Sequence, residues 1–224
     1  MLDFGYYNMD CVDGMKQFPD KYFDLAVVDP PYGIDVGNMN MGLGNSSRCS
    51  KKENRLWGKA EWDKEKPTDD YFSELFRVSK NQIIWGGNYF NLPPSRCFLI
   101  WDKAEGMYGR SFSECEFAWT SLEEPARIFK YSPVDKKRIH PTQKPVALYE
   151  WILSRYAHPG DKILDTHVGS ASSLIACHRK GFRYVGFELD PHYYKLSSER
   201  LQAEESQMNI FDFPEILPEE MRFA

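Results

Sequence analysis

The sequence predicts an α/β fold in which helices cover both faces of a mostly parallel sheet. Short apolar segments alternate along the chain with segments of helical periodicity, which is the pattern of successive strand–helix units. The apolar segments end in polar or small residues, as strands do where a connection to a helix begins. The chain has 224 residues, 42% of them hydrophobic, which is enough to bury one core. We therefore expect a doubly wound α/β domain.

The expected elements follow the chain in order. Strands are predicted at 24–29, 82–85, 97–101, 115–119, 162–165 and 184–188, and helices at 69–78, 144–157, 172–180 and 191–205. Residues 33–54 are rich in Gly, Asn and Ser without periodicity, so we expect a long mobile loop over 33–66, and loops of that length are usually functional. The domain is expected to span 1–206, with 33–66 and 104–138 as insertions and 207–224 as an acidic tail.

Composition narrows the class of protein. No run of residues is long and apolar enough to span a membrane, and the N-terminus lacks the basic-then-apolar pattern of a signal peptide. The five cysteines are scattered without the spacing of metal ligands or of a disulfide framework, which favours a reducing, cytoplasmic compartment and predicts no metal site.

A four-residue segment, Asp29-Pro30-Pro31-Tyr32, follows the apolar run at 23–28. Both prolines lack an N–H and hold the backbone extended, so the segment cannot continue a strand. It presents a carboxylate, carbonyls of fixed direction and an aromatic ring at the carboxyl edge of the sheet. This arrangement suits a flat ring that bears an amino group; a proline turn that happens to carry a tyrosine is the alternative. We call residues 29–32 the hook.

A second segment, residues 162–173, reads Lys-Ile-Leu-Asp-Thr-His-Val-Gly-Ser-Ala-Ser-Ser and predicts a strand, a loop of small residues and the start of a helix. Such a loop lets a ligand approach the backbone closely, and the helix N-terminus favours negative charge. Glu188 ends the next predicted strand, at the position where a ribose is commonly bound through its hydroxyls. A βαβ unit with a surface glutamate is the alternative.

Together these segments resemble the DNA amino-methyltransferases, which methylate exocyclic amino groups of bases. Residues 29–32 look like their catalytic Asp-Pro-Pro-Tyr, and residues 165–173 look like their S-adenosylmethionine loop, here called the cofactor loop. His140-Pro141-Thr142-Gln143-Lys144-Pro145 matches a segment that opens the helix before that loop. Tyr7-Asn8-Met9-Asp10-Cys11 is similar to the segment whose Asp lies near the cofactor adenine. The resemblance runs from about residue 10 to residue 201.

The resemblance implies a Rossmann-like, S-adenosylmethionine-dependent methyltransferase fold and a role for each matching residue. The implied catalytic residues are Asp29, Pro30, Pro31 and Tyr32. Glu188 would bind the ribose, Asp10 the adenine side, and the cofactor loop with Lys144 the methionine end. The full implied cofactor set is Asp10, Cys11, Asp29, Thr142, Lys144, Asp165, His167, Gly169, Ser170, Ala171 and Glu188.

Motif order and two substitutions refine the resemblance. The hook precedes the cofactor loop, as in the β group of the family. Asp at position 29 resembles the first residue of the motif in N6-adenine enzymes, whereas N4-cytosine enzymes more often have Ser there. Cytosine remains an alternative target base. The loop departs from the family pattern Asp-Pro-Phe-x-Gly-Ser-Gly-Thr-Thr at several positions. We expect His167 to be bonded into the local structure, without a role in proton transfer. Ala171 replaces a glycine, which costs little only if the loop needs no positive φ there.

The charge distribution is compatible with a DNA partner. The formal net charge is −5, and residues 199–224, with seven acids and two bases, account for all of it. Two basic clusters near the predicted site are candidate phosphate contacts, with a solvated surface as the alternative. They consist of Arg48, Lys51, Lys52, Arg55 and Lys59, and of Lys136, Lys137 and Arg138.

Residues 104–138 lie where β-group enzymes carry their target-recognition segment, and the segment is short here, which favours a short target, help from the loop at 33–54, or a homodimer. In the tail, Gln207-Met208-Asn209-Ile210-Phe211 resembles the peptide by which bacterial DNA-handling proteins dock on the sliding clamp; packing onto the enzyme itself is the alternative.

The sequence thus predicts methylation of adenine N6 in DNA, with S-adenosylmethionine as cofactor, in the cytoplasm of a bacterial or phage-infected cell. N4-cytosine methylation, an RNA substrate, and a catalytically silent DNA-binding protein of the same fold are the alternatives.

Overall fold

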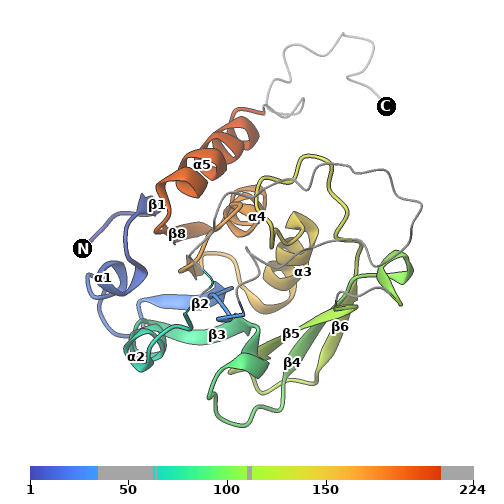
Figure 1. The fold of residues 1–224 in the computed structure, drawn as a ribbon. Coiled ribbons are helices and arrows are strands. Elements are labelled where there is room, and N and C mark those ends of the chain that lie inside the picture. Colours follow the sequence, from blue (N-terminus) through green and yellow to red (C-terminus); the bar gives the residue numbers. More distant parts are fainter. Residues whose placement is uncertain (35–62, 64, 110–112, 208–224) are drawn as a thin grey trace, which may run out of the picture.

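In the computed structural model, which describes residues 1–34, 63, 65–109 and 113–207, the strands form one sheet of eight in the order β1-β8-β7-β2-β3-β5-β4-β6 (Figure 1). The strands are β1 (Gly5–Asn8), β2 (Phe23–Val28), β3 (Ser79–Trp85), β4 (Phe98–Asp102), β5 (Cys115–Thr120), β6 (Arg127–Lys130), β7 (Lys162–Asp165) and β8 (Arg183–Glu188). The helices are α1 (Cys11–Met15), α2 (Asp69–Val78), α3 (Val146–Tyr156), α4 (Ser172–Lys180) and α5 (Pro191–Glu205). Short 3₁₀ turns occur at Gly87–Tyr89 and Glu105–Met107.

The sheet is mostly parallel. Only β5, among the described strands, runs antiparallel to its neighbours, β3 and β4. The predicted α/β class and the mostly parallel sheet are therefore confirmed.

The helices form a layer on each side of the sheet (Figure 1). Successive side chains of a strand point to opposite faces, and β2 divides its apolar residues accordingly. Leu25 and Val27 pack with Leu148 and Ile152 of α3, whereas Ala26, on the other face, packs in the cluster that holds α1 and α2. Residues of β2 are thus buried on both faces, as a central parallel strand requires.

The strand order reverses between β2 and β7. The chain moves outward from β2 to β3 and outward in the opposite direction from β7 to β8, while β2 and β7 pair in parallel through Leu25 with Ile163 and Ala26 with Leu164. Ligands of open α/β sheets bind in the crevice that such a reversal creates at the carboxyl ends of the strands. The hook follows β2 and the cofactor loop follows β7, so both predicted motifs lie at this crevice.

Three described elements were not predicted: β1, α1 and β6. Each has only four or five residues, too few to show a clear period. The helix expected at 144–157 begins at Val146, with Pro145 as its N-cap, so Lys144 lies in the preceding loop.

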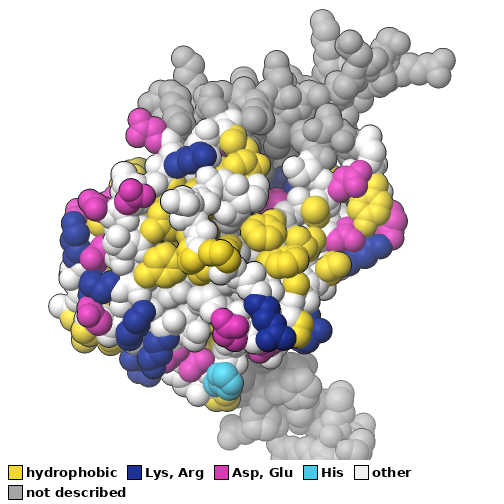
Figure 2. All heavy atoms as spheres, turned by 90° about the horizontal axis from the view of Figure 1, so that it is seen from below, with side chains coloured by type: hydrophobic (Ala, Val, Ile, Leu, Met, Phe, Trp, Pro, Cys, Tyr) yellow, Lys and Arg dark blue, Asp and Glu magenta, His cyan; other side chains and the backbone are white. Residues whose placement is uncertain are grey.

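One face of the molecule, shown in Figure 2, has apolar side chains in its middle with basic and acidic side chains mixed around them. On the described part of this face we see no extended basic surface, and an extended DNA contact would need one. No helix in the described part of the chain is long and apolar enough to cross a membrane.

Candidate active site

A cavity of about 350 Å³ lies at the carboxyl ends of β2, β7 and β8. Its volume falls in the range of small-molecule sites. Ten of the predicted site residues line it: Asp10, Cys11, Asp29, Pro31, Thr142, Lys144, His167, Gly169, Ser170 and Glu188. The other four, Pro30, Tyr32, Asp165 and Ala171, lie outside the lining that the described residues form.

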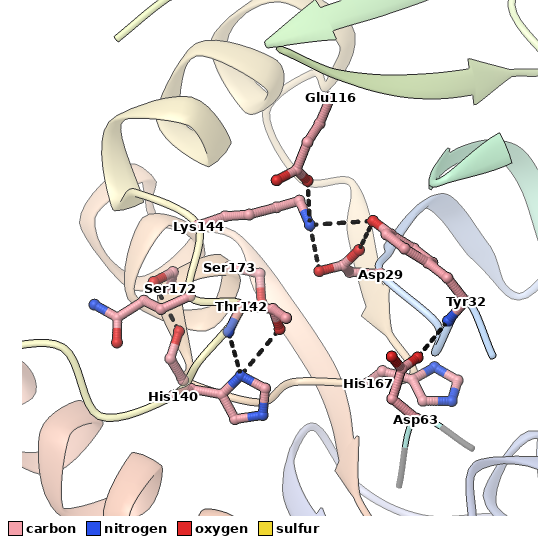
Figure 3. A network of polar contacts seen from close by, with 12 residues as sticks. Asp29, Tyr32, Asp63, Glu116, His140, Thr142, Lys144, His167, Ser172 and Ser173 are labelled. Atoms are coloured by element: carbon pink, nitrogen blue, oxygen red, sulfur yellow. Dashed lines mark hydrogen bonds and ion pairs between the residues drawn. The ribbon is translucent and has the colours of Figure 1, made fainter. Parts of the chain in front are cut away.

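The hook is held by contacts to both its backbone and its side chains (Figure 3). The Tyr32 hydroxyl donates to Asp29 Oδ1 at 2.6 Å, and the Tyr32 N–H donates to Asp63 Oδ1 at 2.8 Å. Burial, with Asp29 nearby, raises the pKa of Tyr32 well above its ordinary value, so its hydroxyl stays protonated. Tyr89 stacks on the Tyr32 ring, with centroids 4.8 Å apart and planes 12° apart.

Gly86 permits this position of the Tyr32 ring. A Cβ at Gly86 would lie 2.1 Å from Tyr32 Cε1, and the residue adopts a φ of +68°. The segment after β3 therefore reaches the same edge of the sheet as the hook, and its residue Tyr89 packs against the hook tyrosine.

Lys144 lies between two carboxylates. Its Nζ donates to Asp29 Oδ2, lies 3.0 Å from Glu116 Oε2, and is 3.4 Å from the Tyr32 hydroxyl (Figure 3). The Lys144 side chain is only 2% exposed. The other oxygen of Glu116 pairs with Lys103 Nζ at 2.9 Å.

The charges of this cluster set one another's pKa values. Burial raises the pKa of Asp29, and Glu116 adds to that rise, while Lys144 opposes it. Burial also works against the charge of Glu116, but Lys144 and Lys103 together bring its pKa down to about 2. Burial disfavours the ammonium of Lys144, yet the two carboxylates outweigh burial and raise the pKa of Lys144. Lys144 is therefore a cation at neutral pH.

The cofactor loop is organised by hydrogen bonds close to it in sequence. Asp165 accepts from the His167 N–H at 3.0 Å and from the Ser173 hydroxyl, and burial raises its pKa to about 7. Glu188 accepts from the Gly169 N–H at 2.8 Å and from the Asp190 N–H at 2.9 Å. Burial raises the pKa of Glu188, and these backbone donors oppose the rise. Asp165 thus holds the loop through these bonds without lining the cavity that the described residues form, whereas Glu188 does line it.

His167 is bonded into the local structure, as expected. Its Nδ1 lies 2.9 Å from Thr166 Oγ1, which is 2.7 Å from the Tyr71 hydroxyl. Burial lowers the pKa of His167 to about 4, so the ring is neutral at pH 7. A neutral ring in the lining does not repel a cationic ligand.

Ala171 has a φ of +60°, so the loop does use the conformation that glycine normally supplies. Replacing the glycine of the family pattern by Ala171 is therefore costly, because the backbone of a residue with a Cβ is held in the left-handed region. Arg200 of α5 donates to the Ser170 carbonyl at 2.5 Å and to the Ser172 hydroxyl at 2.9 Å, which braces this turn.

On the side of the cavity predicted for the adenine, Asp10 is the N-cap of α1 and accepts from the Val12 N–H at 2.8 Å. The Thr142 hydroxyl contacts His140 Nδ1 at 3.1 Å, and burial lowers the pKa of His140 to about 3. Burial raises the pKa of the Cys11 thiol to about 12, so it stays protonated.

Sequence reasoning missed several residues of the site. Glu116 and Lys103 complete the lysine–carboxylate cluster, Asp63 holds the hook backbone, and Arg200 braces the cofactor loop. His140 was visible in the matched six-residue segment but was given no role.

The predicted DNA contacts are described only in part. Arg48, Lys51, Lys52, Arg55 and Lys59 lie outside the described residues, as does 208–211 of the clamp-like peptide. Lys136 and Lys137 are exposed, whereas Arg138 is half-buried and donates to the carbonyls of Pro133 and Pro141. The two lysines therefore remain the better candidates for phosphate contacts, and the dimer and clamp predictions stay predictions.

Asp102, the last residue of β4, and Lys103 after it have different partners: Asp102 accepts from the Tyr108 hydroxyl at 2.6 Å, and Lys103 pairs with Glu116. Adjacent residues of an extended chain point to opposite sides, which keeps the two side chains apart.

Comparisons with known proteins agree with this fold. A family described as DNA methylase (N6_N4_Mtase) matches residues 100–199. The protein named "Putative methylase YubD" of Escherichia coli (strain K12) is 26% identical over 219 residues, covering 89% of this chain and 90% of YubD.

Two solved structures share the fold. The M1.HpyAVI–SAM complex has a TM-score of 0.55 at 20% identity, over 87% of this chain and 98% of that one. PvuII DNA methyltransferase, described as cytosine-N4-specific, has a TM-score of 0.54 at 14% identity, over 89% of this chain and 90% of its own.

Residues 100–199 thus match a DNA methylase family, and the chain shares the Rossmann-like fold of these methyltransferase structures, with the hook and the cofactor loop at its switch point.

Proposed function

We propose that the protein transfers a methyl group from S-adenosylmethionine to the exocyclic N6 amino group of adenine in DNA. The observation that carries the proposal is the position of the Asp29 carboxylate, in the lining of a cavity that it shares with Gly169 and Glu188. A hydrogen-bond acceptor for the amino group and the residues for a nucleoside-containing cofactor thus meet at one crevice.

The residues of the cavity fit S-adenosylmethionine. Bound there, the cofactor supplies a methyl group on a positively charged sulfur. Asp10, Asp29 and Glu188 add carboxylates to the lining, and His167 adds no positive charge because burial keeps its pKa at about 4. Glu188 is held in place by two backbone N–H groups and keeps lone pairs for ribose hydroxyls.

The hook would hold the target base. Extruding an adenine from the duplex costs about a few kcal/mol, and stacking on an aromatic ring returns roughly 1–3 kcal/mol. Asp29 and the Pro30 carbonyl would accept hydrogen bonds from the amino group, which aims the nitrogen at the methyl carbon. The cofactor would supply the methyl group and leave as a neutral thioether, and the proton that the methylated nitrogen releases would pass to water. Positioning supplies most of the rate in such a step.

N4-cytosine methylation is the second candidate. The fold similarity to a cytosine-N4-specific enzyme supports it, and the same hook could hold a cytosine amino group. The presence of Asp at position 29 favours adenine, since N4-cytosine enzymes more often have Ser there.

The test is to incubate the protein with labelled S-adenosylmethionine and unmethylated bacterial DNA, digest the DNA and identify the labelled nucleoside. We expect N6-methyladenine, formed about 10²- to 10⁴-fold more slowly by Asp29→Asn. N4-methylcytosine would overturn the adenine assignment but keep the mechanism. If the protein is folded and binds DNA but the DNA carries no label, a catalytically silent DNA-binding protein would be favoured. If only RNA becomes labelled, the substrate would be RNA and not DNA.

A further inference from the structure

Both oxygens of the Asp29 carboxylate are engaged in the structure, which raises the question of how the base amino group gains access to them. Oδ1 accepts from Tyr32 and Oδ2 accepts from the Lys144 ammonium (Figure 3). A carboxylate has about four acceptor sites, so Asp29 can accept a further donor, but its direct ion pair with Lys144 makes it a poorer acceptor. Asp29 therefore accepts the amino group more strongly when the ammonium has moved off it.

Glu116 is placed to receive it. Glu116 Oε2 already lies 3.0 Å from Lys144 Nζ, so a small movement transfers the ammonium fully to Glu116. A buried ammonium left without a carboxylate would be strongly disfavoured, and Lys144 is 2% exposed. Glu116 keeps Lys144 paired throughout, and no proton has to be transferred.

Glu116 would act on the reaction indirectly, through its contact with Lys144 and the contact of Lys144 with Asp29. It lies outside the described residues that line the cavity, and it comes from β5, inside the predicted target-recognition segment 104–138. Its second oxygen is fixed by Lys103, which directly follows β4. The two lysines and two carboxylates together form a chain, Lys103–Glu116–Lys144–Asp29, that links this segment to the hook.

Resting on the proposed function, we propose that Glu116 is a positioning residue that withdraws Lys144 from Asp29 when the target base enters, so that Asp29 can accept the amino group. The charged and titratable groups that face Asp29 are Lys144, Glu116, Tyr32, Tyr71, Tyr149 and Asp165, and Lys103 faces Glu116.

The first test is Glu116→Gln, which keeps the shape of the side chain and removes its charge. Lys144 then has Asp29 as its only anion in the cluster, so we expect kcat to fall about 10- to 100-fold with the KM for S-adenosylmethionine unchanged. The loss of a nearby negative charge also lowers the pKa of Asp29, so the acid limb of kcat/KM should move about one pH unit lower. Glu116→Asp keeps the negative charge, so its kcat and its acid limb should stay close to the wild-type values.

Two further variants sharpen the test. Lys103→Met removes a positive charge from the other end of the chain, so it should move the acid limb to higher pH. Glu150→Gln is the matched control, because Glu150 also pairs with a cation, Arg179, and its side chain is 28% exposed against 23% for Glu116. It should change neither kcat nor the acid limb. Unchanged kcat in Glu116→Gln, or equal losses in the Gln and Asp variants with a fixed acid limb, would overturn the proposal.

A measurement without turnover separates this inference from the proposed function. The carboxyl ¹³C signal of Asp29 is titrated by NMR in the free wild type and in Glu116→Gln, with thermal unfolding as a check on folding. A lower Asp29 pKa in the variant supports the coupling even if no nucleic acid is methylated, in which case only the proposed function fails. Identical titrations would overturn the coupling whatever the enzyme does.

Discussion

The hook and the cofactor loop lie at the ends of two neighbouring strands, but they are held in place differently. The side-chain partners of the hook, Asp63 and Lys144, lie 31 and 115 residues away along the chain. The cofactor loop has short-range side-chain bonds, Asp165–Ser173 and Gly169–Glu188, which span 8 and 19 residues, and longer ones from Arg200 and Tyr71, which span 30 and 95. Part of the loop is therefore organised by its own βαβ unit, whereas the hook depends on residues far away in the sequence. Substitutions at the hook should therefore lower mainly the rate of turnover, and substitutions at the cofactor loop and its partners should weaken mainly cofactor binding.

The largest expected effect is on turnover, from Asp29→Asn. The amide keeps the shape of the side chain but is a weaker acceptor and leaves Lys144 with Glu116 alone. We expect the single-turnover methylation rate to fall about 10²- to 10⁴-fold, while the affinity for S-adenosylmethionine, measured by calorimetry, falls much less, because Asp29 is one of several carboxylates in the cavity lining. Asp20→Asn, at a surface carboxylate paired with Arg77, is the control and should leave both unchanged. A wild-type rate in Asp29→Asn would refute the role of the hook.

Gly86→Ala should also break the hook and spare the cofactor loop. The new Cβ would lie 2.1 Å from Tyr32 Cε1, so the ring has to shift, and the φ of +68° disfavours alanine as well. A displacement of about 1 Å in a positioning group can cost about 10²-fold in rate, which is the loss we expect in the same single-turnover assay.

The control is Gly106→Ala, because nothing lies within 4 Å of a Cβ at Gly106. It should retain the wild-type rate. Equal rates in Gly86→Ala and wild type would show that the position of the Tyr32 ring is unimportant. A parallel loss of cofactor binding in Gly86→Ala would show that hook and loop are not independent.

Glu188→Gln should have the opposite signature. The carboxylate accepts from two backbone N–H groups, and an amide can satisfy only one of them while its NH₂ opposes the other. We expect the affinity for S-adenosylmethionine, measured by calorimetry, to fall about 10-fold. The rate at saturating cofactor should change much less. Glu199→Gln, on the exposed side of α5, is the control. A pure loss of rate would contradict the assignment of Glu188 to the cofactor.

The same contrast explains how far the sequence could predict this structure. Strands such as Phe23–Val28 and Lys162–Asp165 were recognised because they are apolar runs that end in a turn signal. The fold class followed from their alternation with helices. The strand Arg127–Lys130 was missed because it is an edge strand whose apolar residues are partly exposed, with Ile128 70% exposed.

Within the site, residues carried by contiguous motifs were predicted, and ten of them line one cavity. Residues that reach the hook from elsewhere in the fold were not. Glu116 is one acid in an unremarkable strand, and only the pairing of β4 with β5 places it beside Lys103. Such partners depend on strand order, which the sequence alone left open. The sequence did indicate Ala171 as an exception to the family pattern, and its positive φ gives that exception a measurable consequence.

The smallest effect is the strain stored in the cofactor loop, which two identical substitutions can isolate. Ala171 and Ala176 are both 0% exposed, but Ala171 has a φ of +60° while Ala176 lies inside α4. Replacing either by glycine removes the same buried methyl group and frees the unfolded chain equally. The left-handed conformation costs an alanine about 1–2 kcal/mol, and only Ala171→Gly relieves that cost. Ala171→Gly should therefore exceed Ala176→Gly in free energy of unfolding by about that amount, as measured by urea denaturation. Equal stabilities would mean that the loop relaxes around Ala171 without strain.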